Sequence, residues 1–248
     1  MTTAASVPPD AVERLRGGLI VSCQAYPGEP MRDPRTTAQV ARAAVAGGAA
    51  GVRVQGLEDV ESTSHALDVP VVGLWKHGDA DVFITPTLEH AVGIARAGAD
   101  IVALDGTRRP RPDGLTLVET IRRLRVEVPA VLVMADCGSL DDALAAQVAG
   151  ADLVGTTLAG YTGERARTTG ADLELVAELV GACRVPVVVE GRVHTPDEAA
   201  AAMALGAHAV CVGTAITHPT TITSWFARAV QEARSHPGEG AGERDDEH

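Results

Sequence analysis

One pattern recurs four times in this sequence and limits the fold more than any other feature. A segment rich in alanine and other small residues is followed by a glycine and then by a short run of β-branched residues. This order predicts a helix that ends at the glycine and leads directly into a buried strand. The copies lie roughly 50 residues apart, the length of two strand–helix units of a parallel α/β fold. They span residues 45–54, 93–104, 147–156 and 202–214.

Four further apolar runs lie between these copies and bring the number of predicted strands to eight. The runs are nearly continuous and do not alternate with polar residues, which indicates strands covered on both faces. Eight strands in strict alternation with helices favour a closed (β/α)8 TIM barrel. An open doubly wound sheet usually carries a G-x-G-x-x-G motif after its first strand, and none is present here. The additional runs are residues 18–23, 71–75, 130–134 and 185–190, and a last helix is expected near residues 220–234.

The length of the chain fits one domain. It has 248 residues, of which 46% are hydrophobic, and α/β barrels often reach this size as a single domain. We expect residues 13–234 to form the barrel. Residues 1–12 and the polar tail at 235–248 are expected to be flexible and disordered, respectively.

Composition argues against several classes of partner. Aromatic residues make up only 2% of the chain and the formal net charge is −12, so nucleic acid is not an expected partner. Apolar runs are short, and the N-terminus lacks the pattern of a signal peptide. We therefore expect a soluble cytoplasmic protein that does not contact membranes. The four cysteines lack metal-ligand spacing and are expected to be buried thiols: Cys23, Cys137, Cys183 and Cys211.

A polar residue closes every predicted strand. In TIM barrels the reacting groups lie at the carboxyl ends of the strands, so these residues are the candidates for a site. Helix capping explains Asp105, Thr156 and Thr214 at least as well as function does. The full set is Gln24, Arg53, Lys76, Asp105, Asp136, Thr156, Glu190 and Thr214.

Lys76 and Glu190 differ from the rest, because long ionisable side chains are poor helix caps. Lys76 is also the only lysine among 21 basic residues. Burial and the like charge of Arg53 would lower the pKa of Lys76, and Glu190 could carry a second proton. The two residues together therefore predict acid–base chemistry. The alternative to a catalytic role is a structural one, in which Lys76 and Glu190 form an ion pair or Lys76 points to solvent.

The loops after the last two strands predict a phosphate site. Barrels of this type commonly hold a phosphate there, through backbone N–H groups and a short helix N-terminus. Gly191 and Arg192 follow the seventh strand, and Gly213 and Thr214 follow the eighth. We expect these four residues to contact a phosphorylated ligand.

The helix after the seventh strand has a clear start signal. Thr195 can cap its N-terminus, Pro196 fits the first helical position and Glu198 completes a capping box.

Taken together, these residues resemble the N-acylglucosamine-6-phosphate 2-epimerases, also called N-acetylmannosamine-6-phosphate epimerases. The similarity runs in order from about residue 17 to residue 230. The chain departs from the family pattern at His77 and Gly78, where Arg-Asp is common, and at His218, where arginine is common. The matching blocks are GGLIVSCQA, GVRVQG, ITPT, GADIVALDGTRRPRP, MADC, GADLVGTTLAGYT, VVVEGRVHTP and AVCVGTAIT.

The resemblance implies a cytosolic enzyme of sialic-acid catabolism that needs neither a metal nor a cofactor. It would interconvert N-acetylmannosamine 6-phosphate and N-acetylglucosamine 6-phosphate by moving one proton at C2. The catalytic lysine and glutamate of the family fall on Lys76 and Glu190, and its sugar-binding residues fall on Gln24, Arg53 and Asp136. Asp136 would orient Lys76 or the acetamido group of the sugar.

Two other functions stay open at this point. A barrel lysine can attack a carbonyl covalently, so Lys76 could serve a Schiff-base lyase or aldolase that acts on a sugar phosphate. The chain could also be a non-catalytic phosphosugar-binding protein, since a fold does not fix a function. A binder would not need both Lys76 and Glu190. A homodimer is compatible with the sequence.

Overall fold

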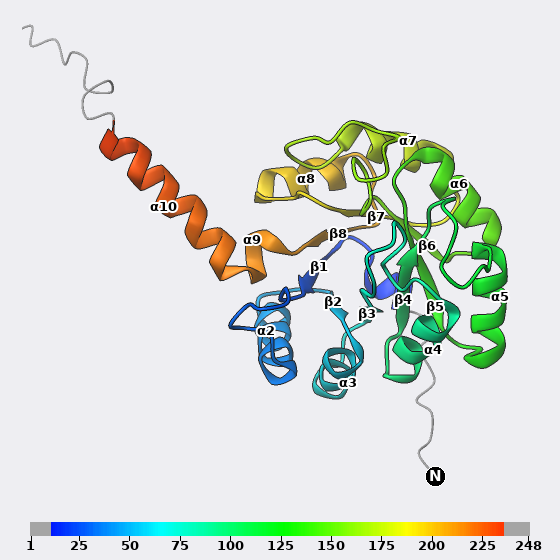
Figure 1. Ribbon diagram of the computed structural model, residues 1–248. Helices are drawn as coiled ribbons and strands as arrows, with labels where there is room; N and C mark the ends of the chain where they lie inside the picture. The colour runs from blue at the N-terminus through cyan, green and yellow to red at the C-terminus, as the bar shows by residue number, and fades with distance from the viewer. Residues whose placement is uncertain (1–10, 236–248) are drawn as a thin grey trace, which may run out of the picture. The chain divides into compact units, whose positions relative to one another are not determined.

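The predicted apolar runs form parallel strands that close into a barrel (Figure 1). The computed structural model describes residues 11–235, and within them each strand pairs with the next in the chain while β8 pairs with β1. Closure leaves no strand edge unpaired. The strands are β1 (Gly18–Cys23), β2 (Gly51–Gln55), β3 (Val71–Leu74), β4 (Ile101–Asp105), β5 (Leu132–Asp136), β6 (Leu153–Gly155), β7 (Val187–Glu190) and β8 (Ala209–Val212).

Helices alternate with these strands and surround them (Figure 1). The capping box of Thr195 and Glu198, with Pro196 in the first turn, begins α8 as predicted. Gly150 ends α6 with a φ of +99°, a left-handed conformation that glycine adopts without steric cost. The helices around the barrel are α1 (Ala11–Arg14), α2 (Pro34–Ala46), α3 (Leu57–Ala66), α4 (Leu88–Arg96), α5 (Leu117–Glu127), α6 (Leu140–Ala149), α7 (Leu173–Ala182), α8 (Pro196–Ala204) and α9 (Thr214–Thr217).

The chain divides into two compact units. The unit that holds the barrel ends at Thr217, and the second unit begins at His218. The second unit contains α10 (Pro219–Ser235), which is the last helix expected near residues 220–234. The barrel itself is a single domain with one closed sheet.

The first described residue, Ala11, is completely buried in α1. The remaining parts of the two predicted flexible ends, residues 1–10 and 236–248, lie outside the described residues. No helix within residues 11–235 is long and apolar enough to cross a membrane.

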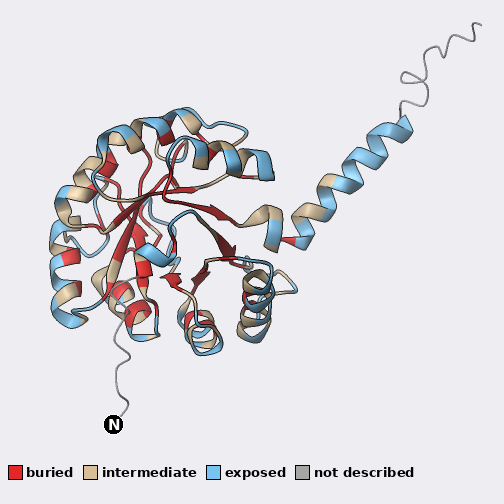
Figure 2. Ribbon diagram, turned by 180° about the vertical axis from the view of Figure 1, so that it is seen from behind, coloured by how far each residue is buried: buried red, intermediate tan, exposed pale blue. Residues whose placement is uncertain are grey.

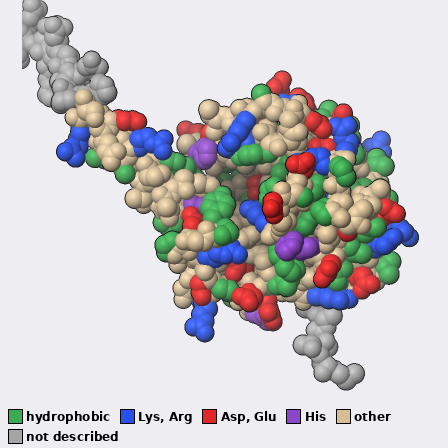
Figure 3. All heavy atoms as spheres, viewed as in Figure 1, with side chains coloured by type: hydrophobic (Ala, Val, Ile, Leu, Met, Phe, Trp, Pro, Cys, Tyr) green, Lys and Arg blue, Asp and Glu red, His purple; other side chains and the backbone are tan. Residues whose placement is uncertain are grey.

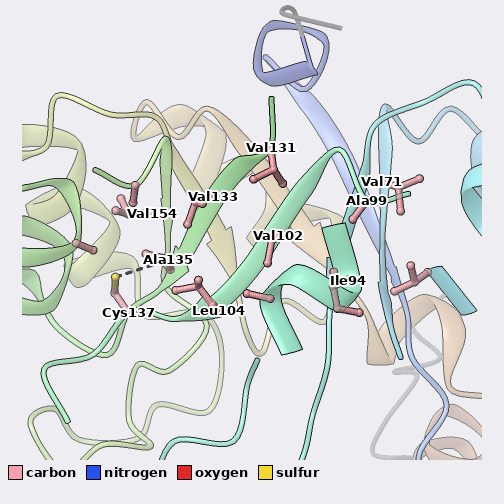
Figure 4. Packing of buried hydrophobic residues seen from close by; sticks show 14 of the residues in the cluster. Val71, Ile94, Ala99, Val102, Leu104, Val131, Val133, Ala135, Cys137 and Val154 are labelled. Atoms are coloured by element: carbon pink, nitrogen blue, oxygen red, sulfur yellow. Dashed lines mark hydrogen bonds between the residues drawn. The ribbon is translucent and has the colours of Figure 1, made fainter. Parts of the chain in front are cut away.

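Side chains of each strand alternate between the barrel interior and the surrounding helices. Figure 2 shows the strands buried, while the helices expose their outer faces. Val102 and Leu104 of β4 pack in the same cluster as Ile94 of α4 (Figure 4). Ile101 and Ala103, the other residues in this alternation, belong to a separate cluster inside the barrel. The interior is therefore a packed core, and only its carboxyl-terminal end is available for a site.

The outer layer is tight enough to require a glycine in β3. A Cβ atom added at Gly73 would lie 2.7 Å from side-chain carbons of both Ile94 and Ala99. Real Cβ atoms do not approach other atoms so closely, so the missing side chain lets α4 lie directly on β3.

Candidate active site

A cavity of about 610 Å³ lies at the carboxyl ends of the strands. Four of the predicted site residues line it: Gln24, Arg53, Lys76 and Glu190. They lie in or directly after four strands, and the alternation of side chains points each of them inward. Figure 3 shows acidic and basic side chains around the hollow at the centre of the molecule.

The centre of the site is a buried arginine held by two carboxylates. Nη1 and Nη2 of Arg53 donate to Oδ1 and Oδ2 of Asp136 at 3.1 and 2.8 Å. Arg53 Nη1 also lies 2.9 Å from Oε2 of Glu190. Arg53 is within β2 rather than after it, and its side chain is only 2% exposed. A buried guanidinium needs such partners, because an uncompensated charge in the interior is strongly destabilising.

Burial and neighbouring charges shift the pKa values of Arg53 and Glu190. Burial by itself would lower the pKa of Arg53, but the carboxylates of Asp136 and Glu190 outweigh it, so the pKa is raised and the guanidinium stays charged. Burial raises the pKa of Glu190, which Arg53 and Lys76 oppose only in part. Glu190 is therefore easier to protonate than an ordinary glutamate.

Lys76 faces the same cavity without a carboxylate partner. Within the described residues no carboxylate oxygen lies within 4.0 Å of its ammonium, and the nearest recorded contact is the ring of Tyr26 at 5.7 Å from its centroid. Glu190 pairs with Arg53 instead, so the expected structural alternative of a Lys76–Glu190 ion pair is not formed. Lys76 reaches solvent through the open cavity, yet burial on its other sides, and then the charge of Arg53, lower its pKa.

Asp136 lies behind the cavity rather than on its wall. It is completely buried, and its two oxygens accept hydrogen bonds from Arg53 and from the hydroxyl of Thr157. Such a carboxylate can hold Arg53 in place. It does not itself line the cavity.

Thr157 was not among the predicted residues, although it lines the cavity. Thr156 is the first polar residue after β6 and was therefore the predicted candidate. In the structure Thr156 Oγ1 bonds to the backbone of Glu190, donating to its carbonyl at 2.8 Å and accepting from its N–H at 3.0 Å. Alternation from Leu153, which lies in the interior, would have placed residue 157 inside and residue 156 in the wall.

Both tyrosines of the chain also line the cavity. Tyr26 and Tyr161 are each about half exposed, at 50% and 49%. The ring of Tyr161 lies beneath the guanidinium of Arg192, 5.4 Å from its centroid to Cζ. The low aromatic content gave no reason to place aromatic residues at the site.

Gln24 is held at the cavity by its neighbour in the strand. Its Nε2 donates to Ser22 Oγ at 2.7 Å, and its Oε1 has no hydrogen-bond partner within the described chain. A buried amide oxygen without a partner is well suited to accept a hydrogen bond from a ligand.

The residues expected to hold a phosphate lie after β7 and β8, outside the lining of the main cavity. Gly191 has a φ of +103° and Arg192 a φ of +57°. The Arg192 guanidinium donates to the backbone oxygens of Ala159 and Gly170 at 2.9 and 3.1 Å. It also donates to the hydroxyl of Thr168 at 3.0 Å, and its charge helps to lower the pKa of Asp172.

The other two strand-end residues have local roles. Asp105 is buried, accepts hydrogen bonds from Thr107 and pairs with Arg109 at 2.8 Å. Gly213 leads from β8 into α9, which begins at Thr214, and a Cβ at Gly213 would lie 3.2 Å from that of Ser22.

The cysteines agree with the expectation of free thiols. Cys23, Cys137 and Cys211 are buried, and Cys183 at the end of α7 is partly buried. Burial raises the pKa of Cys23 to about 12, so its thiol is not ionised at neutral pH. Within residues 11–235, no three His, Cys, Asp or Glu side chains are placed to hold a metal ion.

The closed barrel, with a lysine and a glutamate that face one cavity at the ends of its strands, places the chain among the TIM-barrel proteins with a candidate active site. Comparison with known families makes this specific. Residues 37–232 match the family described as "Putative N-acetylmannosamine-6-phosphate epimerase" (NanE), and the chain belongs to this family.

Individual relatives agree with the family match. The chain is 61% identical over 222 residues to a "Putative N-acetylmannosamine-6-phosphate 2-epimerase" of Cutibacterium acnes, covering 89% of this chain and 96% of the relative. It is 43% identical to the protein of the same description from Caldanaerobacter subterraneus, and the match covers 91% of this chain and 96% of the relative. The solved structure of the N-acetylmannosamine-6-phosphate 2-epimerase from Clostridium perfringens superposes on this chain with a TM-score of 0.84 at 35% sequence identity. The superposition covers 88% of this chain and 95% of the solved one.

Proposed function

We propose that the protein interconverts N-acetylmannosamine 6-phosphate and N-acetylglucosamine 6-phosphate by moving a proton at C2. Membership of the epimerase family supports this substrate. The observation that carries the mechanism is the placement of Lys76 and Glu190 on one cavity, with no ion pair between them.

The reaction begins from the open-chain aldehyde, in which the C1 carbonyl makes the C2 hydrogen acidic. One group of the pair removes this proton, and the C–H electron pair moves toward C1 to give an enolate. The other group then adds a proton to the opposite face of C2 and the carbonyl re-forms. A positioned acid or base contributes ~10²–10⁴-fold to such a transfer.

The pair is active when it holds one proton. In one direction ionised Glu190 is the base and protonated Lys76 is the acid, and in the other direction these roles are reversed. The raised pKa of Glu190 and the lowered pKa of Lys76 bring the two protonation states closer in free energy. A proton can therefore be exchanged between either residue and the substrate at neutral pH.

The surrounding residues hold the pair and the sugar. Arg53 binds Glu190 and is itself fixed by Asp136, so we assign Asp136 a role that acts through Arg53. The unpaired oxygen of Gln24 accepts a hydrogen bond from the sugar or its acetamido N–H.

We place the 6-phosphate at the loops after β7 and β8. The positive φ at Gly191 and the positive charge of Arg192 beside it support this position. A phosphorylated sugar carries charge that an apolar bilayer excludes, and we therefore place the enzyme in the cytoplasm with its substrate.

Proton NMR in deuterated water tests this function against its two rivals. With N-acetylmannosamine 6-phosphate, we expect the signal of the epimer to appear and deuterium to enter at C2. A non-catalytic binder would give neither change. A Schiff-base enzyme would form an imine at Lys76, which borohydride would trap as an adduct visible in the intact mass. A stoichiometric adduct would contradict the acid–base mechanism, and we expect none.

A further inference from the structure

We propose that Thr157 is a positioning residue for this reaction, and that its hydroxyl orients the Glu190 carboxyl group for proton transfer. This role rests on the proposed function, since it acts through Glu190. Nothing in the sequence pattern assigned a role to Thr157.

The hydroxyl of Thr157 lies between the two carboxylates of the site. Its Oγ1 is 2.6 Å from Oδ1 of Asp136 and 3.3 Å from Oε2 of Glu190. Asp136 is completely buried, whereas the Glu190 side chain is 14% exposed at the cavity. Thr157 is thus the only residue besides Arg53, within the described chain, that is recorded as hydrogen-bonded or ion-paired to both carboxylates.

The Thr157 hydroxyl cannot donate hydrogen bonds to both carboxylates at once. A threonine hydroxyl has one hydrogen, so it can make a full hydrogen bond to only one carboxylate at a time. The shorter distance is to Asp136, which also receives two N–H groups from Arg53. When the hydrogen turns toward Glu190, the hydroxyl gives up its shorter bond to Asp136, whose two oxygens keep the N–H groups of Arg53. The bond to Glu190 is therefore the weaker of the two and competes with the bond to Asp136.

Thr157 and Arg53 contact the same oxygen of Glu190. Both contacts are to Oε2, and Oε1 receives no hydrogen bond from the described residues. Holding one carboxylate oxygen fixes the rotation of the group and leaves the other directed to the cavity. Oε1 is therefore the atom that exchanges a proton with C2.

Several charged groups face Glu190, and each contributes to its protonation. Arg53 from β2 and Lys76 after β3 favour the carboxylate, whereas Asp136 from β5 opposes it. Cys211 from β8 also lies near Glu190, but its thiol is neutral because burial raises its pKa far above the ordinary value. The Thr157 hydroxyl acts in the same direction as the cations, because a donated hydrogen bond stabilises the ionised form.

The test compares three variants at neighbouring positions. Thr157→Val keeps the shape and removes the hydroxyl, whereas Thr157→Ser keeps the hydroxyl. Thr156→Val is the matched control, because the Thr156 hydroxyl bonds only to the backbone of Glu190. The readouts are kcat and KM against pH, together with the thermal unfolding temperature of each variant.

We expect Thr157→Val to lower kcat by ~10–100-fold, with KM within ~3-fold of wild type. Loss of the donor raises the pKa of Glu190, so the acidic limb of the kcat profile should move to higher pH. Thr157→Ser should recover kcat to within ~3-fold of the wild-type value, and the acidic limb should return to its wild-type pH. Thr156→Val should leave the limb where it is in the wild type. Should the valine variant not fold, Thr157→Ala removes the same hydroxyl without adding bulk, and the same outcomes apply to it.

Three results would overturn the assignment: an unshifted limb in Thr157→Val, equal loss of kcat in Thr157→Ser, or an equal shift in Thr156→Val. Failure of the proposed function is a separate outcome. In that case wild-type protein would incorporate no deuterium at C2, whereas failure of the Thr157 assignment leaves wild-type exchange intact and affects only the comparison among variants.

Discussion

Lys76 contributes a nitrogen that can lose its proton, and this property separates it from every arginine in the chain. Lys76→Arg keeps a positive charge at the cavity, but a guanidinium stays protonated at all accessible pH values. We expect kcat to fall by ~10²–10⁴-fold, because the substituted side chain cannot act as a base. Steady-state epimerisation assays measure this effect.

The control for Lys76→Arg is the thermal unfolding temperature, which should stay close to that of the wild type because Lys76 makes no ion pair within the described residues. Retention of more than a few per cent of activity in a folded variant would show that Lys76 does not transfer the proton.

Single residues also show where sequence reasoning succeeded and where it failed. Lys76 and Glu190 could be selected because each closes a strand with a side chain that caps poorly. The partner of Glu190 could not be deduced. It depends on distances across the barrel, and these bring Glu190 to Arg53 of β2. Thr157 was missed because selecting the first polar residue after a strand ignores the alternation of faces.

At the scale of elements, the fold was predictable because each strand is a short apolar run bounded by glycine or by a polar residue. All eight predicted strands are present within the described residues. The segment after Thr217 has the helical pattern of the segments before it, so the sequence did not suggest a separate compact unit that begins at His218.

The contact between β3 and α4 gives a prediction about stability. Gly73→Ala would place a methyl group 2.7 Å from Ile94 and Ala99, so α4 must shift outward. Overpacking of this kind costs about 1–3 kcal/mol. Chemical denaturation should show a lower free energy of unfolding. The activity should also fall, because Lys76 lies directly after β3, three residues beyond Gly73.

Gly181→Ala is the matched control for this substitution. Gly181 lies in α7, and an added Cβ there would meet nothing within 4 Å. Alanine is the better helix former by about 0.5–1 kcal/mol, so this variant should be slightly more stable than wild type. Equal effects of the two substitutions would show that α4 does not rest on Gly73.

At the scale of the whole molecule, a protein with one lysine can be modified by amine-directed reagents with unusual selectivity. An amine-directed acylating reagent can modify only Lys76 and the N-terminal amine. The lowered pKa of Lys76 should make it react at a pH where an ordinary lysine is fully protonated. Peptide mass spectrometry measures the rate, and the sugar phosphate should slow labelling of Lys76 but not of the N-terminus. Equal rates with and without the sugar would place Lys76 outside the substrate site.

The charges of the site come from different parts of the barrel. Arg53 and Lys76 belong to β2 and to the segment after β3, whereas Asp136 and Glu190 end β5 and β7. A fragment with only the first four strands would hold the cations without these carboxylates, and the complementary fragment would hold the anions without their arginine. Separating a buried pair is strongly destabilising. The proposed catalytic cluster therefore also holds two half-barrels together, and neither half reaches its most stable state without the other.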